Sequence, residues 1–142
     1  MKKQLLFILF LSIINLGFSQ TTPVVKKGPE ITFLNTIIDY DTIERYSNGT
    51  RTFHFYNTGD EPLIITRVKS GCSCTVANYT KDTIHPGGRG EISATYNTRK
   101  YNAFNRDLTV YSNAKNGSPI KLWIKGFIID PVKMWGVKKK KK

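Results

Sequence analysis

Cys72 and Cys74 are the only cysteines of the chain, and a single residue, Ser73, separates them. In an extended strand, residues two apart point the same way and lie roughly 6.6 Å apart, at ~3.3 Å per residue. That distance is near the upper limit of the Cα separation in a disulfide, which is ~4.4–6.8 Å. Gly71 comes directly before the pair and makes a turn plausible, which would shorten the distance. The spacing is therefore compatible with a disulfide that closes a very small ring.

Three interpretations of this pair remain open. The first is a local structural disulfide that shapes a corner, and such a small ring stabilises the fold only weakly. The second is a soft-metal site, because two thiolates suit Cu(I) or Zn(II) but are half of a tetrahedral set. His85 is the candidate third ligand for Cys72 and Cys74, and His54 is the remaining histidine. The third is a redox dithiol, although the usual motif has two intervening residues at a helix start.

Other catalytic motifs are missing from the sequence. It contains no Gly-x-Ser-x-Gly elbow for a serine nucleophile. Its glycine-rich segment, residues 87–90, joins two expected strands and is typical of a hairpin turn, not of a phosphate loop before a helix. We therefore expect a protein that is not an enzyme and needs no cofactor, apart from the open copper or zinc interpretation.

Short segments of alternating or continuous apolar residues follow one another from residue 30 onward, separated by turn residues. No stretch has apolar residues at the helical spacing over eleven or more positions. Short strands with turn signals every ~8–12 residues favour an antiparallel sandwich or barrel. The expected strands are residues 31–34, 37–41, 50–56, 63–69, 75–79, 90–97, 104–112 and 119–129.

The alternation also predicts which side chains face the core. The last strand departs from it, because Phe127, Ile128 and Ile129 form a continuous apolar end. This end indicates either a strand covered on both faces or an edge strand used by a partner. The side chains expected to point inward are Phe53, Phe55, Ile92, Ala94, Tyr96, Leu108, Val110, Ile120, Leu122 and Ile124.

The N-terminus has the pattern of a secretory signal peptide over residues 1–19. Lys2 and Lys3 precede an apolar run from Leu5 to Leu16, and small residues precede the expected cleavage site. The run is shorter than the ~20 residues that a membrane-spanning helix needs. We expect the mature chain to be exported to the periplasm, the cell surface or the medium, and not to span a membrane. Residues 20–29 are interpreted as a linker.

The net charge of +12 comes largely from the two ends of the chain. Without Lys2, Lys3 and the run Lys138–Lys142, the rest of the chain carries only +5. Residues 131–142 are expected to be a basic, disordered tail, and its lysines are candidates for contact with an anionic membrane or glycan. Nucleic acid is not expected as a partner. The candidate lysines are Lys138, Lys139, Lys140, Lys141 and Lys142.

The span from Glu30 to Asp130 resembles the family known as domain of unknown function 1573. Residues 53–65 are similar to its Phe-x-Phe-x-Asn-Thr-Gly block and the following Pro-Leu-x-Ile strand. Residues 70–75 are similar to its Cys-Gly-Cys-Thr corner, and residues 84–87 to its Ile-x-Pro-Gly turn. Phe104, residues 110–113 and Gly126 complete the resemblance.

This resemblance implies a single immunoglobulin-like antiparallel β-sandwich of about 7–8 strands over residues 30–130. It also implies an exported bacterial protein without an established biochemical activity. The family's cysteine pair corresponds to Cys72 and Cys74, whereas Ser73 stands where the family usually has glycine.

From these observations we predict a binding or adhesion module of the bacterial envelope. Its unknown partner, a protein or a glycan, would dock on an edge strand or on the face that carries Trp123. A thiol-redox or copper-handling protein that uses Cys72 and Cys74 is the alternative. Two Asp-Thr-Ile triplets, at residues 41–43 and 82–84, are further candidates for O-glycosylation.

Overall fold

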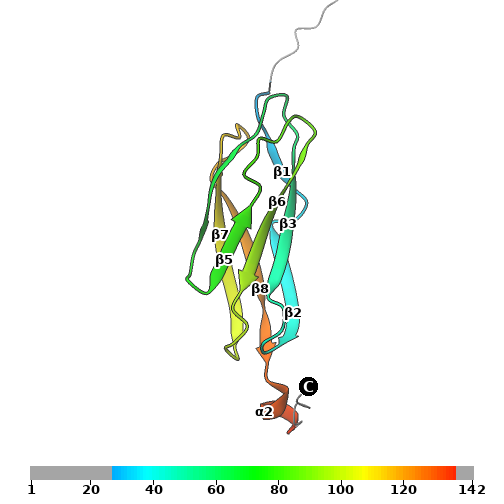
Figure 1. Ribbon diagram of the computed structural model, residues 1–142, viewed down its shortest axis with the longest axis vertical. Coiled ribbons are helices and arrows are strands. Elements are labelled where there is room, and N and C mark those ends of the chain that lie inside the picture. The colour runs from blue at the N-terminus through cyan, green and yellow to red at the C-terminus, as the bar shows by residue number, and fades with distance from the viewer. Residues whose placement is uncertain (1–26, 137–142) are drawn as a thin grey trace, which may run out of the picture.

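The computed structural model describes residues 27–136, which form an elongated β-sandwich with a short helix at its lower end (Figure 1). The eight strands confirm the predicted all-β sandwich. The strands are β1 (Ile31–Phe33), β2 (Ile37–Glu44), β3 (Thr50–Asn57), β4 (Ile65–Ser70), β5 (Thr75–Tyr79), β6 (Arg89–Tyr96), β7 (Ala103–Ser112) and β8 (Ile120–Ile129), and the helix is α2 (Pro131–Trp135).

The strands form two four-stranded sheets, in the orders β1-β3-β6-β5 and β2-β8-β7-β4. Every pair is antiparallel except β2 and β8, which run parallel. The chain passes from one sheet to the other between β1 and β2. In the second sheet, β2 therefore runs in the same direction as the last strand, β8. The predicted antiparallel arrangement therefore needs one correction. A bulge interrupts β2 between Asp39 and Thr42, where Asp41 has a φ of 52°.

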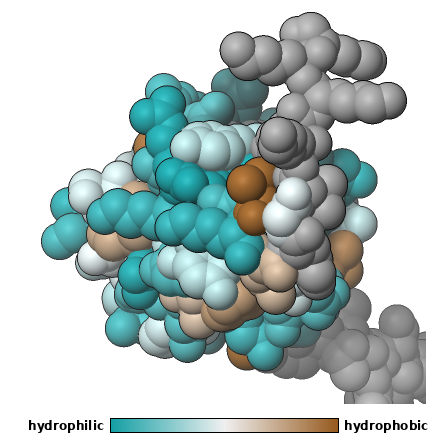
Figure 2. Space-filling model, turned by 90° about the horizontal axis from the view of Figure 1, so that it is seen from below, coloured by the Kyte–Doolittle hydropathy of each residue, from teal (hydrophilic) through white to brown (hydrophobic). Residues whose placement is uncertain are grey.

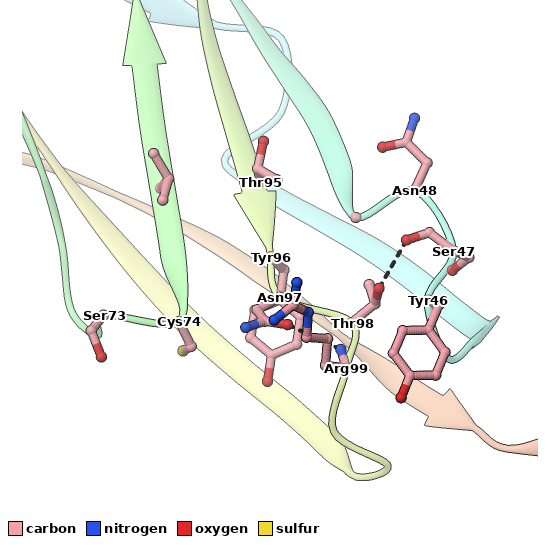
Figure 3. A pocket seen from close by; sticks show the side chains of 12 residues that line it. Tyr46, Ser47, Asn48, Ser73, Cys74, Thr95, Tyr96, Asn97, Thr98 and Arg99 are labelled. Carbon is pink, nitrogen blue, oxygen red and sulfur yellow. Dashed lines mark hydrogen bonds between the residues drawn. The ribbon is translucent and has the colours of Figure 1, made fainter.

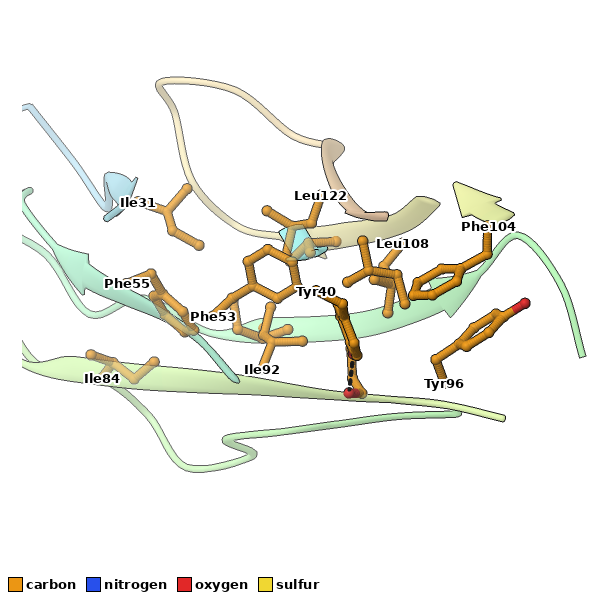
Figure 4. Close-up of a cluster of buried hydrophobic side chains, with 14 of the residues drawn as sticks. Ile31, Tyr40, Phe53, Phe55, Ile84, Ile92, Tyr96, Phe104, Leu108 and Leu122 are labelled. Carbon is orange, nitrogen blue, oxygen red and sulfur yellow. Dashed lines mark hydrogen bonds between the residues drawn. The ribbon is translucent and has the colours of Figure 1, made fainter. Parts of the chain in front are cut away.

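The core fills the space between the two inner faces (Figure 4). Phe53, Phe55 and Ile92 from one sheet lie over Leu108 and Leu122 from the other, and all five are at most 1% exposed. Such side chains remove apolar surface from water, which is the main stabilising term of a fold of this kind. The predicted inward-facing side chains are confirmed, with Ile120 only partly buried at the margin.

The apolar end of β8 follows neither of the two interpretations that the sequence suggested. β8 lies between β2 and β7 in the middle of its sheet, so it is not an edge. Phe127 is 37% exposed and Ile128 is fully buried, so alternation continues to the end of the strand. The Phe127 ring makes an edge contact with Tyr101, at 5.7 Å between ring centroids.

The boundaries of the domain differ from the predicted ones by a few residues on each side. The backbone N–H groups of Lys27 and Gly28 donate to the Asp60 carboxylate at 3.0 and 2.8 Å. The end of the predicted linker is therefore packed on the domain. Residues 131–135, which we placed in a disordered tail, form α2 instead, because Asp130 caps this helix and Pro131 begins it.

The predicted signal peptide, most of the predicted linker and the run Lys138–Lys142 lie outside the described residues. Within residues 27–136, no helix has the length and apolar character that crossing a membrane requires.

Candidate functional site

The two cysteines are joined in a disulfide in the connection between β4 and β5, with 5.3 Å between their Cα atoms. Local hydrogen bonds shape this corner. The Ser70 hydroxyl donates to the Cys72 carbonyl at 2.8 Å, and the Thr75 N–H donates to the same carbonyl at 3.4 Å. These contacts turn the chain back toward the other sheet. The corner therefore links the edge strands of the two sheets, β4 and β5.

Gly71 permits the close approach of β7 to this corner. Its N–H donates to the Asp107 carbonyl at 3.0 Å, and a Cβ at this position would lie 2.2 Å from the Asp107 carboxylate. Ser73 does not need the positive φ that a glycine at this position would allow. Among residues 27–136, the non-glycine residues with positive φ are Asp41 and Tyr46, so serine fits where the family usually has glycine.

The predicted metal set of Cys72, Cys74 and His85 is not brought together. Cys74 lies beyond the C-terminal end of β6, where its carbonyl accepts the Asn97 N–H at 2.9 Å. His85 lies before the N-terminal end of β6, so the length of this strand, roughly 25 Å at ~3.3 Å per residue, separates them. Within residues 27–136, no three His, Cys, Asp or Glu side chains gather as metal ligands. His54 instead contacts Glu91, at 3.2 Å.

A groove of about 620 Å³ opens beside the disulfide corner. Three segments that are far apart in the sequence form it: the β2–β3 turn, the corner with the start of β5, and the end of β6 with the following loop (Figure 3). The lining residues are Tyr46, Ser47, Asn48, Gly49, Ser73, Cys74, Val76, Thr95, Tyr96, Asn97, Thr98 and Arg99.

The walls of this groove combine polar loops with exposed apolar surface. Val76 is 68% exposed and Tyr46 is 62% exposed. Arg99 adds a cation. The Thr98 hydroxyl donates to the Ser47 carbonyl at 2.8 Å and joins two of the three segments. A surface of this composition suits a partner that offers both apolar groups and hydrogen-bonding groups.

Buried aromatic rings support the groove from below. Tyr96 stacks on Phe104 at 3.9 Å between ring centroids, and Tyr40 meets the same ring edge-on at 5.2 Å. The Tyr40 hydroxyl donates to the Gly49 carbonyl at 2.8 Å. Burial raises the pKa of Tyr40 to about 12, against an opposing effect of the Arg51 guanidinium. The groove thus has a rigid base beneath loop-built walls.

The Asn-Thr-Gly block that carries the family resemblance lies at the opposite end and serves the fold. Asn57 is fully buried, and its amide donates to the carbonyls of Glu61 at 2.7 Å and Ile84 at 2.9 Å. Its side-chain oxygen accepts the N–H groups of Gly59 at 3.0 Å and Glu30 at 3.4 Å. One side chain therefore holds three separate segments together.

Trp123 is half-buried on the outer face of β8, in register with Ile37 of β2 and Asp107 of β7. The Lys121 ammonium lies 5.8 Å from the centre of its ring. The threonines of the two Asp-Thr-Ile triplets, Thr42 and Thr83, are both exposed.

Sequence reasoning identified the cysteines but missed the rest of the groove. Tyr46 and Arg99 lie in loops without a recognisable motif, and 52 residues separate them in the chain. The one available signal was the turn at Ser47, Asn48 and Gly49, whose residue types favour tight turns. It indicated a loop but not the surface that the loop faces.

Comparison with known proteins identifies the class of this fold. The family described as protein of unknown function, DUF1573, matches residues 31–128, which is more than half of the chain, so the chain belongs to this family. No curated protein matches it by sequence.

Solved structures with the same fold share little sequence with it. A protein of unknown function from Porphyromonas gingivalis W83 superposes with a TM-score of 0.64 at 14% identity, over 75% of this chain and 51% of that one. The ASH/PapD-like domain 7 of human CEP192 gives 0.58 at 13% identity, over 81% and 94%. The VesB protease of Vibrio cholerae gives 0.57 at 13% identity, over 69% and 32%.

At such low identity these likenesses show the fold alone. The fold is the immunoglobulin-like, PapD-like sandwich, as the family resemblance implied. The chain spans about half the length of the P. gingivalis protein. The fold is consistent with a protein-interaction module, and it occurs in a chain that is a protease as well.

Proposed function

We propose that this protein is an exported, non-enzymatic binding module of the bacterial envelope, and that the groove beside the disulfide corner is its docking site. The observation that carries the proposal is the exposed pair Val76 and Tyr46 around a groove of about 620 Å³. Export is supported by the N-terminal sequence and by the disulfide, since disulfides persist in oxidising compartments.

The edge of β5 favours the groove over strand addition as the mode of binding. The N–H of Thr75 already donates to the Cys72 carbonyl, and that of Tyr79 donates to the Asn78 side chain at 3.0 Å. A partner strand needs a row of available N–H and C=O groups. These local bonds blunt the edge, as natural edge strands often are. A partner segment that inserts apolar side chains beside Val76 suits this surface better.

The test compares matched variants in affinity capture from envelope extracts of the source bacterium. Val76→Asp places a charge in the groove, while Ile37→Asp places one at an exposed position, 54% accessible, on the other sheet. Trp123→Ala tests the face that the sequence suggested. We expect Val76→Asp to lose the captured partner, and Ile37→Asp and Trp123→Ala to keep it.

Two outcomes contradict this proposal. Loss of the partner with Trp123→Ala but not with Val76→Asp moves the site to the β8 face. An identical set of captured proteins for wild type and for every variant removes the binding function at both surfaces.

The thiol-redox or copper function is the second candidate, and one observation favours it. Cys74 lines the groove, so a docked partner could bring a thiol to the disulfide. Counting thiols by mass spectrometry after native purification, with and without Cu(I), tests this function. A permanently oxidised pair that takes up no metal removes it.

A further inference from the structure

We propose that the lower end of the sandwich, beneath the sheet β2-β8-β7-β4, docks on an anionic lipid bilayer. We call this the basal surface and define it by Tyr101, Phe127, Val132 and Met134, with the cations Lys100 and Lys133. It borders the groove, which opens beside β5 and β6, but none of its six defining residues lines that groove. The proposal rests on where apolar side chains, positive charge and the end of the domain coincide.

Exposed apolar side chains concentrate at this end. Val132 is 46% exposed and Met134 48%, both on α2, and Tyr101 is 46% exposed beside Phe127. These four are among the nine large hydrophobic side chains that are exposed in the described part of the chain. Seen from below, this end carries apolar patches within a largely hydrophilic surface (Figure 2). Such a mixture suits the interface of a bilayer, where apolar and polar groups are both accommodated.

The charge at this end is positive. Lys100 and Lys133 lie in the β6–β7 loop and on α2, and Arg99 lies on the side of the groove. Of the carboxylates at this end, Asp130 is paired with Arg45 at 3.0 Å, and Glu44 at the end of β2 is exposed. The sequence then continues from Gly136 into Lys138–Lys142, so five further lysines follow the point where the described domain ends. Charge attraction and the burial of apolar side chains both contribute to peripheral binding at an anionic membrane, and the sequence and structure of this end offer both.

The fold holds α2 in place and so presents its apolar side chains. Asp130 caps the helix by accepting the Val132 N–H at 3.2 Å, and its pairing with Arg45 ties this cap to the β2–β3 turn. At the other end, Gly136 adopts a φ of 66° and its N–H donates to the Val132 carbonyl at 3.1 Å. Val132 and Met134 are thus exposed on an ordered element, and Lys138–Lys142 follow it in the sequence.

The test is co-sedimentation of the mature chain with vesicles of phosphatidylglycerol and phosphatidylethanolamine, and with vesicles of phosphatidylcholine alone. We expect binding to the anionic vesicles at low salt and release at high salt, because charge attraction is screened. Deleting residues 138–142 should weaken binding at least about a hundredfold, since each lysine near an anionic surface contributes about a fivefold gain.

Matched variants separate the surface from the charge. Val132→Asp with Met134→Asp should weaken binding about tenfold or more. Leu34→Asp with Ile64→Asp, two exposed apolar residues elsewhere, should leave it unchanged. These positions are all exposed, so the variants should fold, which circular dichroism checks. Val76→Asp should bind vesicles like the wild type, which keeps this proposal distinct from the groove function.

Three results overturn the proposal. They are no binding to anionic vesicles at low salt, equal loss with both double variants, and binding to a soluble polyanionic glycan with no binding to vesicles.

Discussion

The two ends of the sandwich are built in opposite ways. At the upper end, side-chain amides join the loops: the buried Asn57 makes four hydrogen bonds, and Asn116, an exposed residue, pairs with both the N–H and the carbonyl of Ile31 at 3.0 and 2.9 Å. At the lower end, the loops and the start of β5 surround a groove, and Tyr46 and Val76 are exposed to water there.

This difference separates residues that maintain the fold from residues available for binding. A loop fixed by buried hydrogen bonds cannot open without leaving polar groups unsatisfied, which costs free energy. At the lower end such bonds hold the base of the groove, from the Tyr40 hydroxyl to the Gly49 carbonyl and from the Thr98 hydroxyl to the Ser47 carbonyl, while Tyr46 and Val76 project into water outside them. The conspicuous motif of the family thus lies at the structural end, and the surface available to partners lies at the other.

The largest expected effect is that of Asn57→Ala. Removing this side chain leaves buried carbonyls and N–H groups without partners, so the free energy of unfolding should fall by about 3 kcal/mol. Asn48→Ala is the matched control, because Asn48 is exposed and its side chain accepts the Thr50 N–H, at 2.9 Å, outside the core. Its expected loss is below about 1 kcal/mol. Urea denaturation measures both, and equal losses would end the distinction between the two ends.

Tyr40, at the base of the groove, should make the stability of the protein depend on pH at high pH. The pKa of tyrosine in the unfolded chain is about 10, whereas burial raises the pKa of Tyr40 in the folded protein to about 12. The folded state therefore holds its proton more tightly, and stability should fall as pH rises from about 10 to 12, on the order of 2 kcal/mol. Tyr40→Phe should lack this part of the loss, and Tyr101→Phe, at an exposed ring, should retain it. A pH series of thermal unfolding tests both.

Reduction of the disulfide should change stability less. The bond closes a ring between residues only two apart, so it removes little freedom from the unfolded chain, and the loss should stay below about 1.5 kcal/mol. Urea denaturation with and without a reductant measures this loss, and the variant with both cysteines changed to serine checks it. A loss as large as that of Asn57→Ala would mean that the corner supports the whole fold.

The smallest expected effect concerns the cap of α2. A hydrogen bond from Arg45 holds the pKa of Asp130 below its ordinary value of 3.8, with opposition from desolvation. The folded state therefore prefers the ionised carboxylate, and this contribution is present above pH 3.8 and is lost as pH falls below it. Asp130→Asn should remove that dependence while keeping a capping side chain. Thermal unfolding measured between neutral and acidic pH tests this prediction. Equal losses of stability in the wild type and in Asp130→Asn would contradict it.

Periodicity in the sequence predicted the fold well, because alternation with a period of two reports burial directly. Phe53 and Phe55 on one strand and Leu122 and Ile124 on another were expected in the core and are there. The parallel pairing of β2 with β8 was not predictable from alternation, because strand direction depends on where the chain crosses between sheets. The ordered α2 was missed because a five-residue helix is too short to show periodicity.

The candidate site was only partly accessible from the sequence. Cys72 and Cys74 stood out by type and spacing, and their separation allowed the disulfide that the structure contains. His85 was a candidate ligand because the sequence does not show how far apart two residues lie along a sheet. In the structure, the length of β6 separates His85 from the cysteines.

Local chemistry therefore determined the strands, the turns, the core side chains and the cysteine pair of this protein, since each depends on residues close together in the chain. Tertiary structure alone decided that the β2–β3 turn, the disulfide corner and the β6–β7 loop share one groove. It also decided that Asn57 holds the opposite end together. The physical reason is that a surface made of distant segments exists only after the two sheets have packed, and no local pattern encodes which loops then meet.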